Sequence, residues 1–184
     1  SVSARLKLYP STFSEIVDGL EGMLRMPHGC FEQTSSATHP NVMILRYLRA
    51  HELDVPEVSM RAEQYILRGY QRLLSFEVKR GGFDWFGHPP ARVILTAYGL
   101  MEFTDMAAVR HVDPALLERT ADWLASKQAS DGSWRPRHGH FHEMPIRSGR
   151  IAATAYVAWA LASYDPDRRA VTEAAAYLQQ HLSE

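Results

Sequence analysis

The chain has one cysteine, Cys30, among its 184 residues, so no disulfide framework and no cysteine-rich metal site can form within it. A lone cysteine is an inert buried thiol, a nucleophile, half of an intermolecular bridge, or one end of an acyl bond to a neighbouring side chain. Two further features are missing. No apolar run approaches the roughly 20 residues that cross a bilayer, and residues 1–10 lack the apolar core of a secretory signal. We expect no membrane insertion by this segment.

The chain also lacks an excess of charge of either sign. Its formal net charge is −1 and its basic residues are scattered, which excludes the electrostatic footprint of a nucleic-acid partner or of an anionic membrane surface. With 46% hydrophobic and 22% charged residues, the composition is that of a globular domain with one buried core. The start at Ser1 without methionine indicates a piece excised from a longer protein.

Strand signals are few, whereas apolar residues recur at helical spacing along most of the chain. Amphipathic or apolar helices are predicted over residues 14–24, 56–76, 93–101 and 114–128. A further helix is predicted to begin at the helix-start residues Thr34-Ser35-Ser36 and Thr38-His39-Pro40 and to end at about residue 52. Between the helices over 56–76 and 93–101, residues 79–90 are predicted to form a loop rich in glycine and aromatic residues. The sequence therefore predicts an all-α fold.

A repeat strengthens this prediction. A second aromatic loop begins at Asp131-Gly132-Ser133-Trp134, residues 153–156 echo residues 95–98, and residues 175–178 echo residues 121–124, at offsets of 58 and 54 residues. A period near 55 with one apolar and one amphipathic helix per unit indicates stacked helical hairpins whose apolar helices face a common centre. The expected architecture is an α/α toroid or solenoid.

The cysteine lies three residues before Gln33. In a helix or turn, positions i and i+3 share one face with their Cβ atoms about 5–6 Å apart. The Cys30 sulfur is then within reach of the Gln33 side-chain carbonyl, and attack there expels ammonia and leaves an internal β-cysteinyl-γ-glutamyl thioester.

The full motif, Pro27-x-Gly29-Cys30-x-Glu32-Gln33, resembles the thioester motif of the α2-macroglobulin and complement C3-like family. Phe31 stands where vertebrate members usually have glycine, and in this respect the chain is similar to the bacterial α2-macroglobulin branch. The resemblance implies an α/α toroid of six hairpins, of which about three fit here. We expect a lead-in or linker and a short helix in residues 1–26, and a partial thioester domain in residues 27–184.

The resemblance also implies a function. Family members capture attacking proteases or surface nucleophiles covalently after cleavage of a bait segment exposes the bond. The expected partners are these targets and the other domains of the same parent protein. This is a single-turnover acyl transfer by a protease inhibitor and not enzymatic turnover; it needs no cofactor and takes place outside the cell or in the periplasm. Cys30 is the thiol leaving group and Gln33 the acyl donor. Because an internal thioester needs apolar cover against water, Met23, Met26 and Phe31 are candidates for part of that cover.

A histidine completes the resemblance. In the family a histidine attacks the thioester first, and the freed thiolate then serves as base for a hydroxyl acceptor. The loop from Asp131 to Met144 resembles the family's histidine loop, with His142 as the candidate and His140 as second choice. An extended segment would place His138, His140 and His142 on one side, as in a set of metal ligands. No carboxylate or thiol at motif spacing completes the set, so no metal site is predicted.

Three other interpretations stay open. Residues 127–134 resemble the Gln-Trp repeat of triterpene cyclases, which share the α/α toroid, although the chain has no Asp-x-Asp-Asp or other aspartate-rich diphosphate site. On the thioester interpretation this segment braces helix ends, with glutamine and tryptophan tying one hairpin to the next. A Cys/His hydrolase using Cys30 and His142 is chemically conceivable but leaves Gln33 and the repeat unexplained. The third is a binding domain of the same fold without an active thioester.

Overall fold

The structure, a computed structural model, describes residues 3–4, 6–78, 81–135 and 149–181. It contains α1 (Thr12–Met23), α2 (Phe31–Ala50), α3 (Pro56–Leu74), β1 (Glu77–Val78), β2 (Gly82–Phe83), α4 (Val93–Ala107), α5 (Pro114–Ala125), α6 (Gly149–Tyr164) and α7 (Arg169–His181). The two strands are two residues long and pair antiparallel with each other. The predicted all-α class is confirmed. None of the described helices is both long and apolar enough to cross a membrane.

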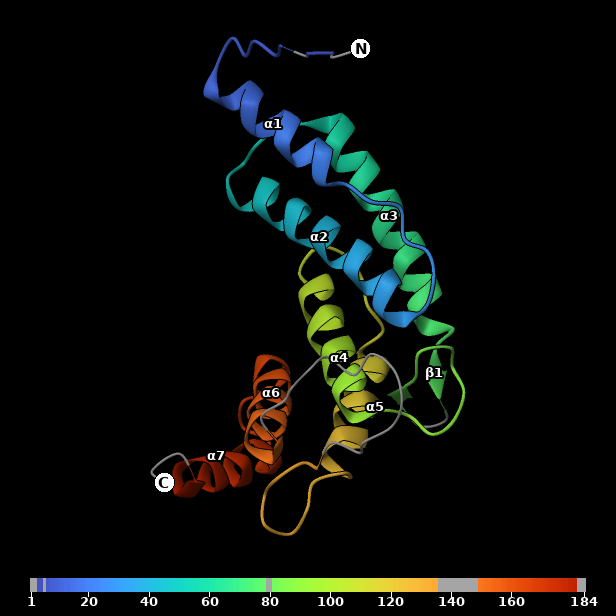
Figure 1. The fold of residues 1–184 in the computed structure, drawn as a ribbon, viewed down its shortest axis with the longest axis vertical. Helices are drawn as coiled ribbons and strands as arrows, with labels where there is room; N and C mark the ends of the chain where they lie inside the picture. Colours follow the sequence, from blue (N-terminus) through green and yellow to red (C-terminus); the bar gives the residue numbers. More distant parts are fainter. Residues whose placement is uncertain (1–2, 5, 79–80, 136–148, 182–184) are drawn as a thin grey trace.

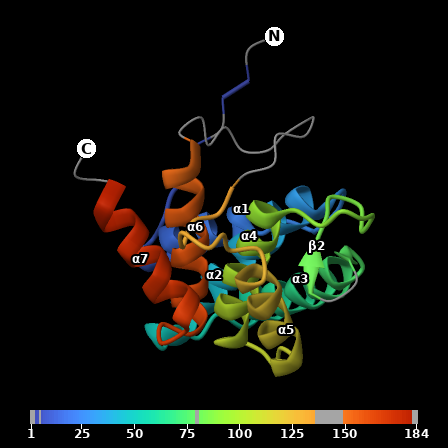
Figure 2. The same cartoon turned by 90° about the horizontal axis from the view of Figure 1, so that it is seen from below.

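The helices after α1 form three successive hairpins, α2/α3, α4/α5 and α6/α7. The first lies in the upper part of the molecule, and the other two lie next to each other below it (Figure 1). Helix α4 contacts both α2 and α6, so one helix of each hairpin contributes to a continuous inner row. In the view turned by 90°, α5 lies below α4 (Figure 2), and it contacts both α4 and α6. The predicted toroidal arrangement of hairpins agrees with this packing.

Helix α1 lies against the first hairpin. The segment that follows it is fixed to α2 by Asn41, whose side chain accepts from the Arg25 N–H at 3.2 Å and donates to the Arg25 carbonyl at 2.8 Å. Glu21 pairs with Arg61 of α3 at 2.8 Å. The short helix expected within residues 1–26 is therefore packed on the domain that follows it.

Helix α2 begins earlier than its serine and threonine residues predict. Cys30 is its N-cap, with extended backbone angles (φ −74°, ψ −178°), and Pro40 lies inside the helix, where the Ser36 carbonyl loses its usual donor. The predicted starts at Thr34 and Thr38 are wrong because both hydroxyls are used otherwise: Thr34 Oγ1 donates to the His28 carbonyl at 3.2 Å, and Thr38 Oγ1 to the Thr34 carbonyl at 2.8 Å.

One three-residue pattern occurs in the loop before each inner helix. A glycine with positive φ is followed, two residues later, by a fully buried aromatic side chain. The three copies are Gly29-Cys30-Phe31, Gly81-Gly82-Phe83 and Gly132-Ser133-Trp134, with glycine φ angles of 81°, 93° and 84°. Phe31, which departs from the vertebrate motif, is thus the first of three equivalent core aromatics, and its ring centroid lies 5.3 Å from that of Phe83.

The loops before α4 and α6 are attached to the core in the same way. The backbone N–H of Phe83 donates to Thr96 Oγ1 at 2.9 Å, and that of Trp134 donates to Thr154 Oγ1 at 3.0 Å. Gln128 then joins two hairpins, because its Nε2 donates to the Gly132 carbonyl at 2.9 Å and to the Ala170 carbonyl of α7 at 2.8 Å. The Gln-Trp segment therefore braces helix ends, as predicted.

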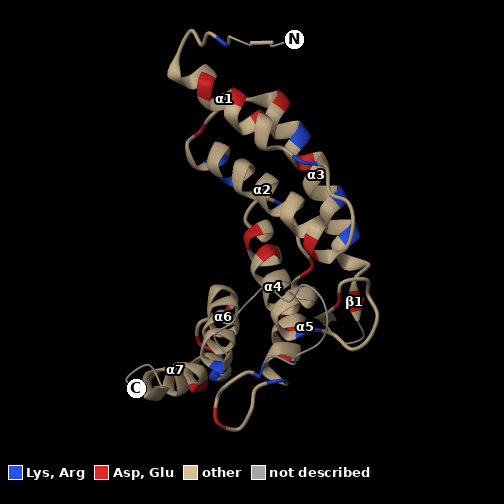
Figure 3. Cartoon of the chain, viewed as in Figure 1, with Lys and Arg blue, Asp and Glu red and all other residues tan. Residues whose placement is uncertain are grey.

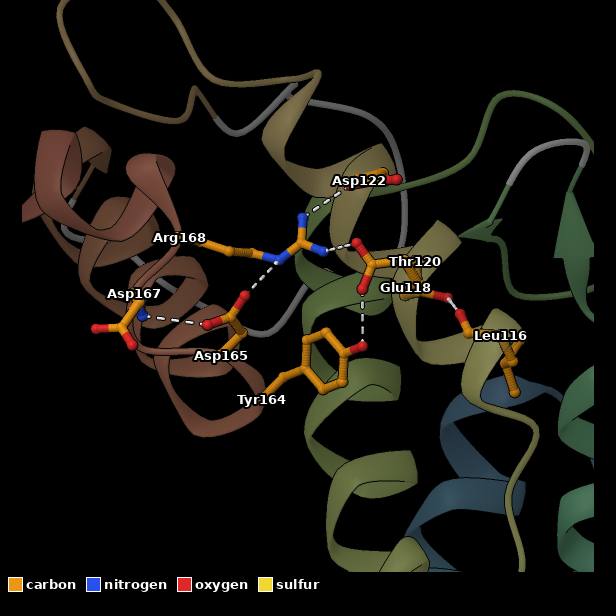
Figure 4. A network of polar contacts seen from close by, with 8 residues as sticks. All are labelled: Leu116, Glu118, Thr120, Asp122, Tyr164, Asp165, Asp167 and Arg168. Atoms are coloured by element: carbon orange, nitrogen blue, oxygen red, sulfur yellow. Dashed lines mark hydrogen bonds and ion pairs between the residues drawn. The ribbon is translucent and has the colours of Figure 1, made fainter.

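Arg168 makes a second connection between hairpins (Figure 4). It precedes α7, and its guanidinium pairs with Glu118 and, at 2.8 Å, with Asp122, both on α5. It also lies 3.5 Å from Asp165, and the Tyr164 hydroxyl donates to Glu118 at 2.8 Å. The Arg168 side chain is only 14% exposed, and these carboxylates offset the cost of burying its charge.

We expect Arg168→Met to lower the free energy of unfolding by about 1–2 kcal/mol, because it leaves Glu118 and Asp122 without their shared cation while both stay partly solvated. Arg169→Met is the matched control: Arg169 is 90% exposed and pairs with Glu173 within α7, so about 0.5 kcal/mol or less is expected. Urea denaturation of both variants measures the difference, and equal losses would show that the Arg168 cluster does not join the hairpins.

Charged residues of both signs are interspersed over the elements (Figure 3). This mixture of both signs along the elements agrees with the formal net charge of −1.

Candidate functional site

Cys30 and Gln33 lie together at the N-terminus of α2. They form a reciprocal capping box, in which the Gln33 backbone N–H faces the Cys30 side chain and the Cys30 backbone N–H donates to Gln33 Oε1 at 3.2 Å. Gln33 thus occupies the third helical position, where a capping box places Glu or Gln. Its side chain folds back over the residue that carries the thiol, as the i, i+3 spacing predicts.

Gly29 makes room for this arrangement. A Cβ atom built on Gly29 would lie 2.0 Å from Gln33 Oε1 and 2.8 Å from its Cδ, and the φ of +81° is itself a conformation that L side chains rarely adopt. Glycine is therefore required at this position for two reasons: the backbone has a positive φ, and the Gln33 side chain occupies the place of a Cβ atom.

The loop that carries Cys30 is held from two sides. Arg72, in the last turn of α3, donates to the Gly29 carbonyl through Nε at 2.9 Å and also through Nη2. The Phe31 N–H donates to the Trp85 carbonyl at 2.9 Å. Pro27, before the motif glycine, is buried. The contacts from Arg72 and Trp85 come from two distant parts of the chain and fix the loop against the first two hairpins.

The site is open to solvent. Cys30 is half-buried, Gln33 is exposed, and an open depression of about 320 Å³ borders the glutamine. It is lined by Arg25, Met26, His28, Glu32, Gln33, Ser36 and Ala37.

The residues expected to cover the bond do not enclose it. Met23 and Met26 expose about half of their surface (54% and 50%), and Phe31 points into the core. Met26 lines the open depression beside Gln33, whereas Met23 and Phe31 are not among its lining residues.

Behind the site, between α2 and α4, a carboxyl group is fully buried. Neither oxygen of Glu102 nor the Ser35 hydroxyl has a hydrogen bond of standard geometry to any described residue. Burial raises the pKa of Glu102 to about 8; the Ser35 hydroxyl opposes this shift and the Asp105 carboxylate adds to it. With this pKa, Glu102 keeps its proton at neutral pH. Burial likewise raises the pKa of Tyr156 to about 12.

The family model for the A-macroglobulin TED domain matches residues 2–184 of this chain. The chain belongs to this family. Thioester-containing protein 1 of Anopheles gambiae is a relative: its allele R1 is 30% identical over 169 residues, which are 90% of this chain and 13% of that protein. Alleles S3 and S1 are 29% identical over the same length. The chain thus spans about an eighth of the length of these curated relatives. They are mosquito proteins, so the bacterial branch suggested by Phe31 stays a prediction.

The histidine candidates of this TED-domain chain, His142 and His140, lie outside the described residues, as does His138 of the zinc alternative. Among the residues that the structure does describe, no group of three or more His, Cys, Asp or Glu side chains is placed to hold a metal ion. The assignment of His142 to acceptor choice stays a prediction.

Sequence reasoning missed Arg72 and Glu102. Arg72 is 43 residues from the carbonyl it contacts and belongs to no local motif. Glu102 follows directly after the apolar run 93–101, and the only signal for it is an acidic residue at a position that continues the buried face of that helix.

Proposed function

We propose that this TED domain carries an internal thioester between the Cys30 sulfur and the Gln33 side-chain carbonyl carbon and uses it for one covalent capture. The observation that carries the proposal is the contact of Gln33 Oε1 with the Cys30 N–H across the space that Gly29 leaves free. In the forming step the thiol sulfur attacks the Gln33 amide carbon, the C–N bond breaks, and ammonia leaves with the thiol proton. In capture a nucleophile takes the acyl group and its proton passes to the cysteine sulfur.

The exposed position of Gln33 supports access by a large acceptor, such as an amine or hydroxyl on a protease or a cell surface. Because the described residues leave the site open, we propose that other domains of the longer protein supply the cover and that cleavage in that protein removes it. His142 is the proposed acceptor-selecting residue, with His140 as second choice. The proposal includes that the parent protein acts outside the cell or in the periplasm, which family membership supports.

Intact mass spectrometry of the freshly purified, full-length protein tests the proposal. We expect the wild type to be lighter than its sequence mass by one ammonia, and methylamine to abolish this deficit by adding to Gln33. Cys30→Ala, which has no thiol to attack the amide, is expected to show its unmodified sequence mass with or without methylamine. A native wild-type protein at its unmodified sequence mass would refute the thioester.

A further inference from the structure

The peptide unit between Gly29 and Cys30 is held at both of its polar ends. Its carbonyl oxygen accepts two hydrogen bonds from the Arg72 guanidinium, and its N–H donates to Gln33 Oε1. A peptide unit is planar and conjugated. Fixing its carbonyl therefore also fixes the direction in which its N–H points.

Arg72 is itself fixed by packing. Its guanidinium lies over the Phe76 ring, with 5.5 Å from Cζ to the ring centroid. Phe76 in turn packs edge-on against Phe31, at 6.1 Å between centroids. The cation is thus held between the end of α3 and the aromatic core beneath the motif, although its outer surface is exposed.

The Gln33 carbonyl oxygen is the atom on which negative charge develops in both steps of the proposed chemistry. It gains charge when the Cys30 sulfur attacks the amide carbon, and again when a nucleophile attacks the thioester carbon and the C–S bond breaks. A donor already aimed at this oxygen lowers the barrier of both steps. A cation on the carbonyl of the same peptide unit strengthens that donor, because hydrogen bonds in a chain polarise one another.

We propose that the Cys30 N–H is the oxyanion donor of the thioester reaction and that Arg72 is the positioning residue that aims and strengthens it. This inference rests on the proposed thioester. It assigns to Arg72, a residue outside the motif, an effect on the rate of acyl transfer as well as on the shape of the loop.

The test compares Arg72→Met, Arg72→Lys and Arg68→Met in the full-length protein. Arg68 lies one turn earlier on α3, is also exposed, and contacts Met26 Sδ at 3.7 Å instead of the Gly29 carbonyl, so its variant matches the loss of charge. The readouts are the rate of methylamine incorporation by mass and the carbonyl stretch of the thioester by infrared spectroscopy with ¹³C-labelled glutamine.

We expect Arg72→Met to react with methylamine about tenfold more slowly than wild type, less than the loss of a direct oxyanion donor because Arg72 acts through the peptide and is screened by solvent. Its thioester carbonyl should absorb at higher frequency, since the hydrogen bond to the oxygen is weaker. Arg72→Lys keeps a charge and one donor and should recover part of both effects, while Arg68→Met should match wild type.

The role of Arg72 would be overturned if Arg72→Met carries the ammonia mass deficit, reacts with methylamine as fast as Arg68→Met, and shows an unshifted carbonyl band. If Arg72→Met does not fold, Arg72→Lys decides: a rate and band equal to wild type overturn the proposal, and intermediate values support it. Absence of the mass deficit from the wild type itself would instead refute the proposed function, so the two failures are distinguishable.

Discussion

We expect Gly29→Ala to prevent the ammonia deficit in the full-length protein and to lower the free energy of unfolding by about 2–3 kcal/mol. A left-handed backbone costs an L residue about 1–2 kcal/mol. The new methyl group would also lie 2.0 Å from Gln33 Oε1, so the glutamine must leave its position and the Cys30 N–H loses its acceptor. For a domain of this size the loss corresponds to a melting temperature lower by about 5–10 °C.

Gly19→Ala is the matched control for this change. Gly19 lies in α1 with no atom within 4 Å of the position of a Cβ, so alanine there is expected to leave the deficit intact and to stabilise the helix by about 0.5–1 kcal/mol. The double variant Gly29→Ala/Gln33→Ala separates the two causes, because it removes most of the clash and keeps the backbone strain. Gly29→Ala with a full deficit and an unchanged melting temperature would contradict the assigned role of the glycine.

We expect Glu102→Gln to remove a large part of the pH dependence of stability. The folded pKa of about 8 lies above the ordinary value of 4.5, so between these values the folded protein keeps a proton that the unfolded chain has lost. The free energy of unfolding then falls as the pH rises from about 4.5 to about 8 and is level above that range. Glutamine stays neutral throughout. The variant should resemble wild type near pH 5 and exceed it at pH 9 by roughly 3–5 kcal/mol.

Urea denaturation between pH 5 and pH 9 measures this difference. The groups that bear on Glu102 are the Ser35 hydroxyl from α2 and Asp105 and Tyr98 on α4 itself, and all three are retained in the variant. Glu57→Gln, an exposed position in the first turn of α3, makes the same chemical change and is expected to shift stability by less than about 0.5 kcal/mol at any pH. Parallel curves for wild type and Glu102→Gln would show that the carboxyl does not titrate in this range.

The sequence predicted what depends on local spacing. Apolar periodicity and the repeat near 55 residues predicted the hairpins. The three-residue separation of Cys30 and Gln33 places both at one helix end, and the bond between their side chains stays a prediction. The start of α2 was misplaced because serine and threonine are the usual N-caps, whereas here the cap is the cysteine itself. Pro40 added to the error, since a proline ten residues into a helix resembles a helix start.

What could not be predicted depends on contacts between distant parts of the chain. Arg72 is an exposed arginine of α3, as Arg68 is, and only the packing of α3 on the loop before α2 brings it to Gly29. Glu102 continues an apolar helix, and its burial follows from the approach of α2 to α4. The exposure of Met23 and Met26 likewise follows from where α1 ends on the first hairpin.

Cys30 occupies the middle position of a loop that the fold uses twice more, where Gly82 and Ser133 stand in its place. The glycine before it and the aromatic residue after it therefore belong to the scaffold as well as to the motif. A relative that had lost the reactive pair would therefore be expected to keep both residues, for the sake of the fold. Only the middle residue and the glutamine three positions later would distinguish a copy of this loop that can form a thioester from one that has a structural role alone.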